Sequence, residues 1–267
     1  MQKTIVGNWK MHGEPAMAHD LALAVADAAD KLPAGIEVVV CPPAILISQV
    51  ITSLIGSKVK VGGQDCHSQP SGAFTGDIGA PMLKAAGCSH VIVGHSERRL
   101  YHQESNEDVR QKAARAIESG LIPIICVGES EAERDSGQAM EAVGRQLVES
   151  IPGWGRSYSA GANLAPLPAS PLMGEGKCHF LLAYEPVWAI GSGKTPSGDD
   201  IRQMHLHIRS VAALQLGLAP ERISVLYGGS VKAANAREII GVEGVSGVLV
   251  GGASVKAEEF CNIVASG

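Results

Sequence analysis

Long apolar runs, aromatic residues and an excess of one charge sign are all scarce in this 267-residue sequence. No apolar run approaches the roughly 20 residues that a membrane-spanning helix requires, which excludes an integral membrane protein. Aromatic residues make up 4%, and 22 Lys and Arg stand against 27 Asp and Glu, so the basic stripe typical of nucleic-acid binding is missing. Because 45% of the residues are nevertheless hydrophobic, a collagen-like fibre and a disordered chain are also excluded.

Signals for export and for disulfide bonds are missing too. The first residues, Met1–Val6, run directly into a strand-like segment, without the charged and apolar regions of a secretory signal peptide. None of the six cysteines forms a C-x-x-C pair, and we expect a cytoplasmic protein with reduced cysteines packed as small hydrophobic residues. The cysteines are Cys41, Cys66, Cys88, Cys126, Cys178 and Cys261.

The histidines do not have the spacing of metal ligands. None of the nine belongs to an H-E-x-x-H motif. His205 and His207 lie two positions apart, which on a helix points their side chains to different sides. We therefore expect no metal site.

Eight short segments rich in β-branched residues are present, with longer helical patterns between them. Runs such as Val38–Val40 are continuously apolar, which is typical of parallel strands covered on both faces. The strands that we predict are Thr4–Asn8, Ile36–Cys41, Lys58–Gly62, His90–Gly94, Ile122–Val127, His179–Tyr184, Ile223–Tyr227 and Gly247–Val250.

The helical patterns complete the fold prediction. Ser197 followed by Asp200 is typical of a capping box, and Gly217 stands where that helix should end. Eight strands, each followed by a helix in about 250 residues, predict one α/β domain over 1–267, a (β/α)8 barrel of eight parallel strands with outer helices. An open doubly wound sheet is the alternative, but Gly7–His12 lacks the G-x-G-x-x-G motif usual after its first strand.

One segment breaks the alternation. Residues 152–177 are rich in Gly, Pro and Ala and have neither a helical nor a strand period. Connections from a helix to the next strand usually take about 2–6 residues. We expect an inserted loop on the end of the barrel opposite the active site.

Polar residues and glycine pairs follow the predicted strands. Gly228-Gly229 and Gly251-Gly252 each present backbone N–H groups without a Cβ, which favours a phosphate site over simple tight turns, and Lys10 adds a cation at the same mouth. His95 follows an apolar strand and opens a helical turn, so it is either a packed structural histidine or a neutral hydrogen-bond donor. Glu185 ends another buried strand and is either paired structurally or kept as a base.

A segment with an apolar middle follows Glu185. It joins a flexible Gly-Ser-Gly stretch to prolines near both ends, and a simple connector does not need Val, Trp, Ala and Ile in a row. We interpret it as a lid that closes over a ligand and excludes water. Its residues are Pro186, Val187, Trp188, Ala189, Ile190, Gly191, Ser192, Gly193, Lys194 and Thr195.

Five motifs, in this order along the chain, resemble the triosephosphate isomerase family. They are Asn8-x-Lys10, Gly94–Arg99, Ala183–Thr195, Tyr227–Ser230 and Leu249–Ser254. The resemblance extends over the whole chain except part of 152–177. It implies a TIM barrel that interconverts dihydroxyacetone phosphate and D-glyceraldehyde 3-phosphate through an enediolate, in glycolysis and gluconeogenesis, with no cofactor and no metal.

The resemblance also implies a role for each site residue. Glu185 would be the base, His95 the neutral electrophile, Lys10 the group that stabilises negative charge and Asn8 the group that orients the substrate. Glu97 would pair with the Lys10 region. The phosphate would be held by Gly191 on the lid and by the backbone of Ser230, Gly251 and Gly252.

A further part of the resemblance concerns self-association. Gln64–Gly79, with Thr75 in its middle, is similar to the loop through which the family forms homodimers. Asp65 stands where the family often has Asn, and we expect it to change hydrogen bonds of this loop. Ser246 stands where an Asp is common, and we expect it to weaken support of the phosphate site.

Two other functions fit the same barrel. Another phosphosugar enzyme, such as an epimerase or lyase, would need metal ligands or a carboxylate pair. A catalytically silent phosphosugar-binding barrel would have lost the base, the histidine or the lysine. The presence of Glu185, His95 and Lys10 favours the isomerase over both, with a small phosphosugar as the partner rather than a nucleic acid or a membrane.

Overall fold

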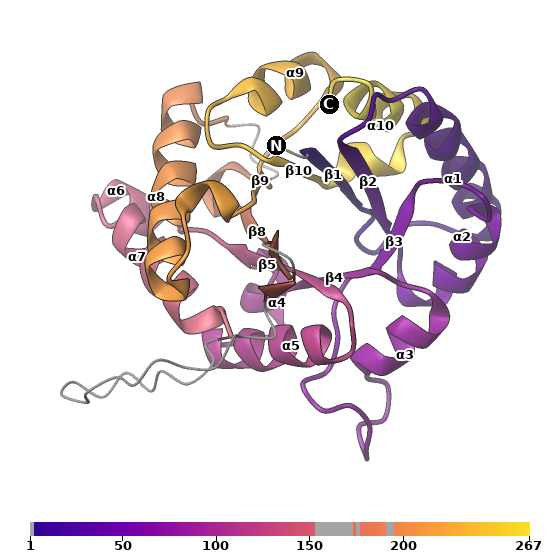
Figure 1. Ribbon diagram of the computed structural model, residues 1–267, viewed down its shortest axis with the longest axis horizontal. Helices are drawn as coiled ribbons and strands as arrows, with labels where there is room; N and C mark the ends of the chain where they lie inside the picture. Colours follow the sequence, from indigo (N-terminus) through magenta and orange to yellow (C-terminus); the bar gives the residue numbers. More distant parts are fainter. Residues whose placement is uncertain (1–2, 153–172, 175–176, 191–194) are drawn as a thin grey trace.

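Eight parallel strands close into a barrel in the computed structural model, which describes residues 3–152, 173–174, 177–190 and 195–267. Around the ring the order is β1-β10-β9-β8-β5-β4-β3-β2, and β2 returns to β1 (Figure 1). The strands are β1 (Lys3–Asn8), β2 (Ile36–Cys41), β3 (Lys60–Gly63), β4 (His90–Val93), β5 (Ile122–Val127), β8 (Leu181–Tyr184), β9 (Val225–Tyr227) and β10 (Gly247–Val250).

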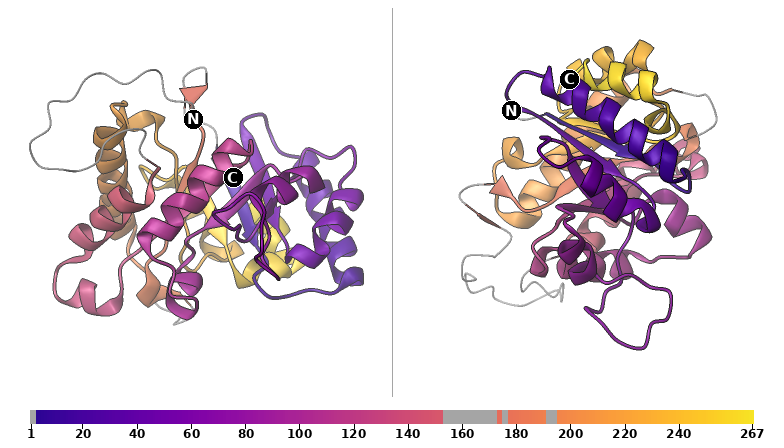
Figure 2. Two further views of the ribbon diagram at one scale, coloured as in Figure 1. Left: turned by 90° about the horizontal axis from the view of Figure 1, so that it is seen from below. Right: turned by 90° about the vertical axis from the view of Figure 1, so that its right-hand side faces the viewer.

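Helices surround the ring of strands, as the views in Figure 1 and Figure 2 show. Short 3-10 turns η1 (Ala44–Leu46), η2 (Val187–Ala189), η3 (Pro220–Arg222) and η4 (Gly252–Val255) lie in the connections. The helices are α1 (Pro15–Asp30), α2 (Ile47–Ser53), α3 (Ala80–Ala86), α4 (Ser96–Tyr101), α5 (Asn106–Glu118), α6 (Glu131–Asp135), α7 (Ala139–Ser150), α8 (Gly198–Leu216), α9 (Ala233–Gly241) and α10 (Ala257–Val264).

The continuously apolar strands are explained by two core layers. Alternate side chains of a strand point to opposite faces, so Val39 lies inside the barrel while Val38 and Val40 pack against the helices. The interior layer contains Val6, Val39, Cys41, Ile92, Ile124, Cys126, Ala183, Leu226 and Leu249. Because both faces are covered, every residue of these strands gains from being apolar.

The first and last strands of the barrel pair directly. Thr4 lies opposite Gly247, and Gly7 lies opposite Val250. Gly247 has a positive φ, and a Cβ there would lie 1.8 Å from the carbonyl oxygen of Thr4. Glycine is therefore required at this position, because any side chain would force β1 and β10 apart and open the barrel.

The predicted barrel is confirmed, with shifted strand ends. β3 begins and ends later than predicted, and β8 and β9 begin two residues later, because ladder pairing starts only where a neighbouring strand is within hydrogen-bonding reach. Ser197 and Asp200 form the predicted capping box, and Gly217 ends α8 in the left-handed conformation. Five cysteines are free thiols, four of them buried, while the Cys178 side chain lies outside the described part.

The segment 152–177 departs from its prediction where it is described. Met173–Gly174 (β6) and Lys177–Cys178 (β7) form a two-stranded antiparallel sheet, although no strand was expected there. Residues 153–172 and 175–176 lie outside the described residues, so most of the expected insertion does too. Within the described residues, no helix is long and apolar enough to cross a membrane.

Candidate functional site

Five polar side chains converge where β1, β4 and β8 end. Parallel strands all end at the same mouth of the barrel, so residues distant in sequence meet there. Asn8 is the last residue of β1, and Lys10 follows it. His95 and Glu97 begin α4 just after β4, and Glu185 follows the last residue of β8. The structure thus brings together the five residues that the sequence predicted as catalytic.

His95 and Glu185 form a buried pair. Nε2 of His95 lies 2.9 Å from Oε1 of Glu185, and their side chains are 8% and 2% exposed. The other carboxylate oxygen of Glu185 accepts the backbone N–H of Ser96 at 2.8 Å. The backbone N–H of Glu97 donates to Nδ1 of His95 at 3.2 Å, so the ring proton facing Glu185 lies on Nε2.

Burial and charge act in opposite directions on this pair. Burial alone would lower the pKa of His95, but the Glu185 carboxylate, with help from Glu97, raises it above its ordinary value. Burial would raise the pKa of Glu185, but His95 and the hydrogen bonds from Ser96 lower it. Glu185 is therefore a desolvated, ionised carboxylate, which is the state that a base must have before it takes a proton.

Lys10 is held in an unusual backbone conformation. Its φ is +50°, a region that non-glycine residues rarely adopt. Its backbone N–H donates to Oδ1 of Asn8 at 3.0 Å, and its carbonyl accepts from Nε2 of Gln64 at 2.8 Å. Its ammonium group donates to Oε1 of Glu97 at 2.5 Å. Gln64 was not predicted to support the site, although it also follows the end of a strand.

The glycines predicted to bind phosphate lie at the same mouth. A Cβ on Gly251 would lie 3.2 Å from Cε of Lys10, while Gly252 faces open space within 4 Å. The hydroxyl of Ser230 donates to the carbonyl of Ala189 at 3.0 Å, which joins the loop after β9 to the beginning of the lid. Gly191, and Ser192–Lys194 with it, lie outside the described residues.

A second buried carboxylate binds the start of the segment predicted as a lid. Glu129 is 0% exposed, and its Oε1 accepts from the hydroxyl of Tyr184 at 3.0 Å and from Nε1 of Trp188 at 2.7 Å. The guanidinium of Arg134 lies over the Trp188 ring, 4.2 Å from its centroid. Burial raises the pKa of Glu129. No role was predicted for Glu129, although its place just beyond β5 is a signal that points to it.

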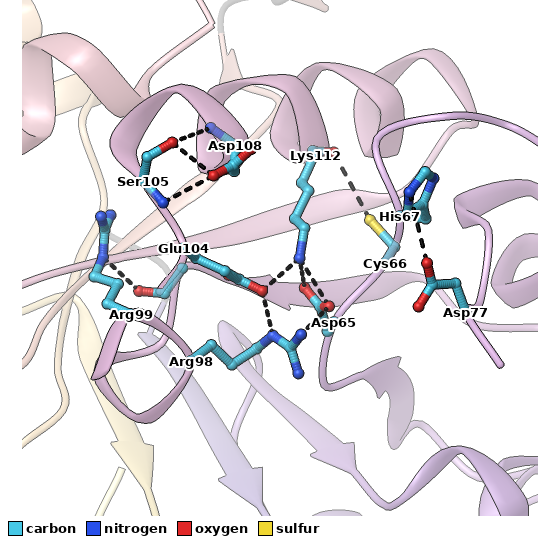
Figure 3. Close-up of polar contacts among 11 residues, drawn as sticks. Asp65, Cys66, His67, Asp77, Arg98, Arg99, Glu104, Ser105, Asp108 and Lys112 are labelled. Atoms are coloured by element: carbon cyan, nitrogen blue, oxygen red, sulfur yellow. Dashed lines mark hydrogen bonds and ion pairs between the residues drawn. The ribbon is translucent and has the colours of Figure 1, made fainter. Parts of the chain in front are cut away.

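Asp65 belongs to a partly buried network of four charges (Figure 3). Its carboxylate accepts from the Lys112 ammonium, 2.9 Å from each oxygen, and from Nη2 of Arg98 at 2.9 Å. Glu104 accepts from Lys112 and from Nε of Arg98, both at 2.5 Å. Burial raises the pKa of Asp65 although both cations oppose the change, whereas the two cations hold the pKa of Glu104 low against its burial. Asp65 therefore attaches the start of the 64–79 loop to α4 and α5.

The rest of that loop folds on itself. His67 stacks on Phe74 with ring centroids 4.0 Å apart. Nε2 of His67 lies 3.6 Å from Oδ2 of Asp77 (Figure 3). The backbone N–H of His67 donates to the carbonyl of Ile78 at 2.8 Å, which closes the base of the loop. Thr75 is exposed at its tip.

Ser246, the second departure noted in the sequence, lies beside Arg209. Its hydroxyl oxygen accepts from Nη2 of Arg209 at 2.8 Å and from the backbone N–H of Val225 at 3.2 Å. Ser246 is 1% exposed and Arg209 is 8% exposed. The hydroxyl keeps hydrogen bonds between α8, β9 and β10, but it supplies no negative charge to the arginine. Among the described side chains, no group of three His, Cys, Asp or Glu residues has the arrangement of a metal site.

Comparison with known proteins identifies the family. The family model described as triosephosphate isomerase matches residues 3–267. Triosephosphate isomerase of Afipia carboxidovorans is 47% identical over 97% of this chain and 95% of its own, and that of Acidiphilium cryptum is 46% identical over 100% and 98%. The crystal structure of triosephosphate isomerase from Bartonella henselae superposes with a TM-score of 0.83 at 38% identity, covering 100% of this chain and 99% of that one. This chain belongs to the triosephosphate isomerase family.

Proposed function

We propose that Glu185, His95, Lys10 and Asn8 are the groups with which this enzyme interconverts dihydroxyacetone phosphate and D-glyceraldehyde 3-phosphate. The family membership establishes the isomerase activity. The observation that supports these roles is the buried 2.9 Å contact between Glu185 and His95 beside the Lys10 ammonium. A base, a neutral donor and a cation are thereby collected at one mouth of the barrel.

Glu185 carries the proton between two carbon atoms. From dihydroxyacetone phosphate it takes a proton from C1, so that a C–H bond breaks, an O–H bond forms on the carboxylate and the electron pair moves onto the carbonyl oxygen at C2. In the resulting enediolate the hydroxyl proton on the C1 oxygen passes to the C2 oxygen, and Glu185 returns its proton to C2, which gives the aldehyde with a hydroxyl at C2. Since Glu185 is 2% exposed, bulk water competes poorly for the proton.

His95 acts as a neutral hydrogen-bond donor to the substrate oxygens. In the ligand-free site the Glu185 charge raises its pKa. Nδ1 of the ring accepts the backbone N–H of Glu97, so the ring is held in the neutral tautomer whose proton lies on Nε2. A donor already in place stabilises the charge that develops on the substrate oxygen without reorganisation.

Lys10 and the glycine loops hold the charged parts of the substrate. The ammonium group provides a cation for the oxyanion and the phosphate, and Glu97 fixes its position at 2.5 Å. Backbone N–H groups of Ser230, Gly251 and Gly252, together with Gly191 on the closed lid, hold the phosphate. The lid Pro186–Thr195 closes over the substrate, and its closure keeps the enediolate from losing phosphate.

The assembly, location and insertion remain part of the proposal. A homodimer forms through the 64–79 loop, whose tip carries Thr75, and the enzyme is cytoplasmic. Large apolar side chains are exposed on the segments that follow four adjacent strands, which supports burial against a second copy. They are Met11, Ile45, Phe74 and Tyr101. The chain forms a single barrel domain, and the inserted loop at 152–177 has no part in catalysis.

Replacement of the base tests the proposal. Glu185→Gln removes the proton acceptor and keeps the size, so kcat falls at least about 100-fold with a modest change in KM. Turnover is measured in both directions with coupled assays on the folded variant. Glu238→Gln, an exposed change on α9, is the matched control and keeps parental rates. A kcat within about threefold of the parent in Glu185→Gln would remove Glu185 from the role of base.

A further inference from the structure

One side chain, that of Gln146, binds both the backbone N–H and the backbone carbonyl of Gly128. Gly128 is the first residue beyond β5, where the ladder of strand hydrogen bonds ends. Oε1 of Gln146 accepts the backbone N–H of Gly128 at 3.0 Å, and Nε2 of Gln146 donates to the carbonyl of Gly128 at 3.0 Å. A single amide thus satisfies both backbone groups of the residue.

Gly128 lies directly against the backbone of Glu185. A Cβ built on Gly128 would lie 1.7 Å from the carbonyl oxygen of Glu185 and 2.6 Å from its carbonyl carbon. Its φ is not in the left-handed region, so close approach, and not backbone conformation, is the reason for glycine here. A displacement of Gly128 toward Glu185 therefore pushes the backbone of Glu185 as well.

The neighbours of Gly128 bind the same strand end. The carbonyl of Val127 accepts the backbone N–H of Glu185 at 2.8 Å, and the carbonyl of Glu129 accepts that of Val187 at 3.2 Å. The segment Val127–Glu129 is therefore hydrogen-bonded to the backbone of the proposed base and to the start of the lid. Gln146 holds the middle of this segment.

The two hydrogen bonds from Gln146 to Gly128, called the clamp below, start from a helix that is packed against the barrel, and a cavity lies beside them. Gln146 lies on α7 between Val143 and Leu147, which are both 0% exposed and fix the helix against the barrel. A hollow of about 250 Å³ is lined by Gln146, Glu185 and Val187 among others. Without the clamp, the strand end has room to move, because packing alone does not close this side.

We propose that Gln146 is a positioning residue for catalysis: its amide fixes the Gly128 peptide, and the Gly128 peptide fixes Glu185 relative to His95. The inference rests on the proposed role of Glu185 as the base. Gln146 acts through Gly128 and does not touch the substrate. Its amide suits the task because it presents an acceptor and a donor, which match the backbone N–H and C=O of a single residue.

Gln146→Leu tests this role. Leucine keeps much of the volume but removes both hydrogen bonds. A shift of about 1 Å at a reacting group can lower rates about 100-fold, so we expect kcat to fall between about 10- and 100-fold with KM changed less than about threefold. In the parent, His95 and Ser96 lower the pKa of Glu185; a displaced Glu185 loses those contacts, and the acid limb of the kcat/KM profile moves to higher pH.

Gln215→Leu is the matched control. Gln215 on α8 is also half-buried, and its Nε2 donates to the carbonyl of Val148 on α7 at 3.0 Å. Within the described residues its side chain has no hydrogen bond to the strand ends, so this change lowers the melting temperature while kcat and the pH profile stay parental. If Gln146→Leu behaves in the same way as Gln215→Leu, with only its stability lowered, the positioning role is refuted.

Gln146→Glu gives a signature that a structural role would not produce. When ionised, the new carboxylate accepts from the Gly128 N–H but repels its carbonyl. When protonated, it again offers an acceptor and a donor, so the clamp is restored. The ratio of kcat in Gln146→Glu to kcat in the parent therefore rises as pH falls through the pKa of the new carboxyl, and a ratio that is constant with pH overturns the proposal.

The two proposals fail separately. Parental turnover in Glu185→Gln refutes the proposed base, whatever the Gln146 variants do. An inactive Glu185→Gln together with parental kcat in Gln146→Leu and a constant ratio in Gln146→Glu refutes only the clamp. If Gln146→Leu does not fold, the pH dependence of Gln146→Glu decides the matter.

Discussion

Removing the Lys112 ammonium from the four-charge network around Asp65 tests how much this network contributes to the stability of the fold. Lys112→Met keeps the length of the side chain and deletes its charge. The ammonium donates to both oxygens of Asp65 at 2.9 Å and to Glu104 at 2.5 Å, and the side chain is only 11% exposed. The change leaves two carboxylates and one cation, Arg98, in a largely buried place.

The structure sets the size of the effect. Deleting one partner of a buried ion pair typically costs about 3–5 kcal/mol, because the remaining charge is left uncompensated. The free energy of unfolding of a domain is only about 5–15 kcal/mol, so this loss is a large share of the total stability. At about 2–4 °C for each kcal/mol, the melting temperature should fall by roughly 6–20 °C.

Equilibrium urea unfolding followed by circular dichroism measures this loss. Lys31→Met is the control, because the Lys31–Asp27 pair is 74% and 78% exposed and contributes at most about 0.5 kcal/mol. Asp65→Asn alone should destabilise the protein. In the double variant with Lys112→Met it should compensate in part, because one carboxylate then faces one cation, and the coupling energy should be about 1–3 kcal/mol. Equal losses in Lys112→Met and Lys31→Met, or strict additivity in the double variant, would refute the reasoning.

Three further outcomes are expected. Burial lowers the pKa of His205 to about 3, below its ordinary 6.5, so its contribution to the free energy of unfolding is full above pH 6.5 and is lost as pH falls toward 3. In urea titrations at several pH values, His205→Gln should flatten the slope of the unfolding free energy against pH over this range. An unchanged slope would contradict the assignment. Excess EDTA should leave kcat/KM unchanged, whereas a loss restored by a divalent ion would favour an epimerase. Replacing 156–175 with a short Gly-Ser turn should preserve kcat/KM, and a large fall with the fold intact would place the insertion at the active site.

Strand periodicity predicted the barrel well because its signal is local. A parallel strand covered on both faces must be apolar at successive positions, and Val38–Val40 meets that demand without help from distant residues. Knowing that strand ends share one mouth then brought Lys10, His95 and Glu185 together before their distances were known. The antiparallel pairing of β6 with β7 was missed, because strands of two residues leave no period to detect.

Contacts between side chains and distant backbone were beyond the sequence. Gln146 lies in an ordinary helical pattern, and nothing in that pattern indicates that its amide meets the Gly128 peptide. The left-handed backbone of Lys10 has no composition signal either, since it is maintained by Asn8 and Gln64 across the barrel mouth. Asp65 was noticed as a departure, but its ion pairs depend on how α4 and α5 approach the loop.

The pairing of β1 with β10 has a consequence for synthesis on the ribosome. One side of β1 can pair with β2 early, but its other side stays an open edge until Gly247–Val250 has been made. Lys10 cannot meet Gly251 before that point, so an incomplete chain holds the lysine without the last loop of the site. Enzyme activity is therefore acquired late, and the unpaired edge of β1 is a place where a nascent chain is exposed to association with other chains.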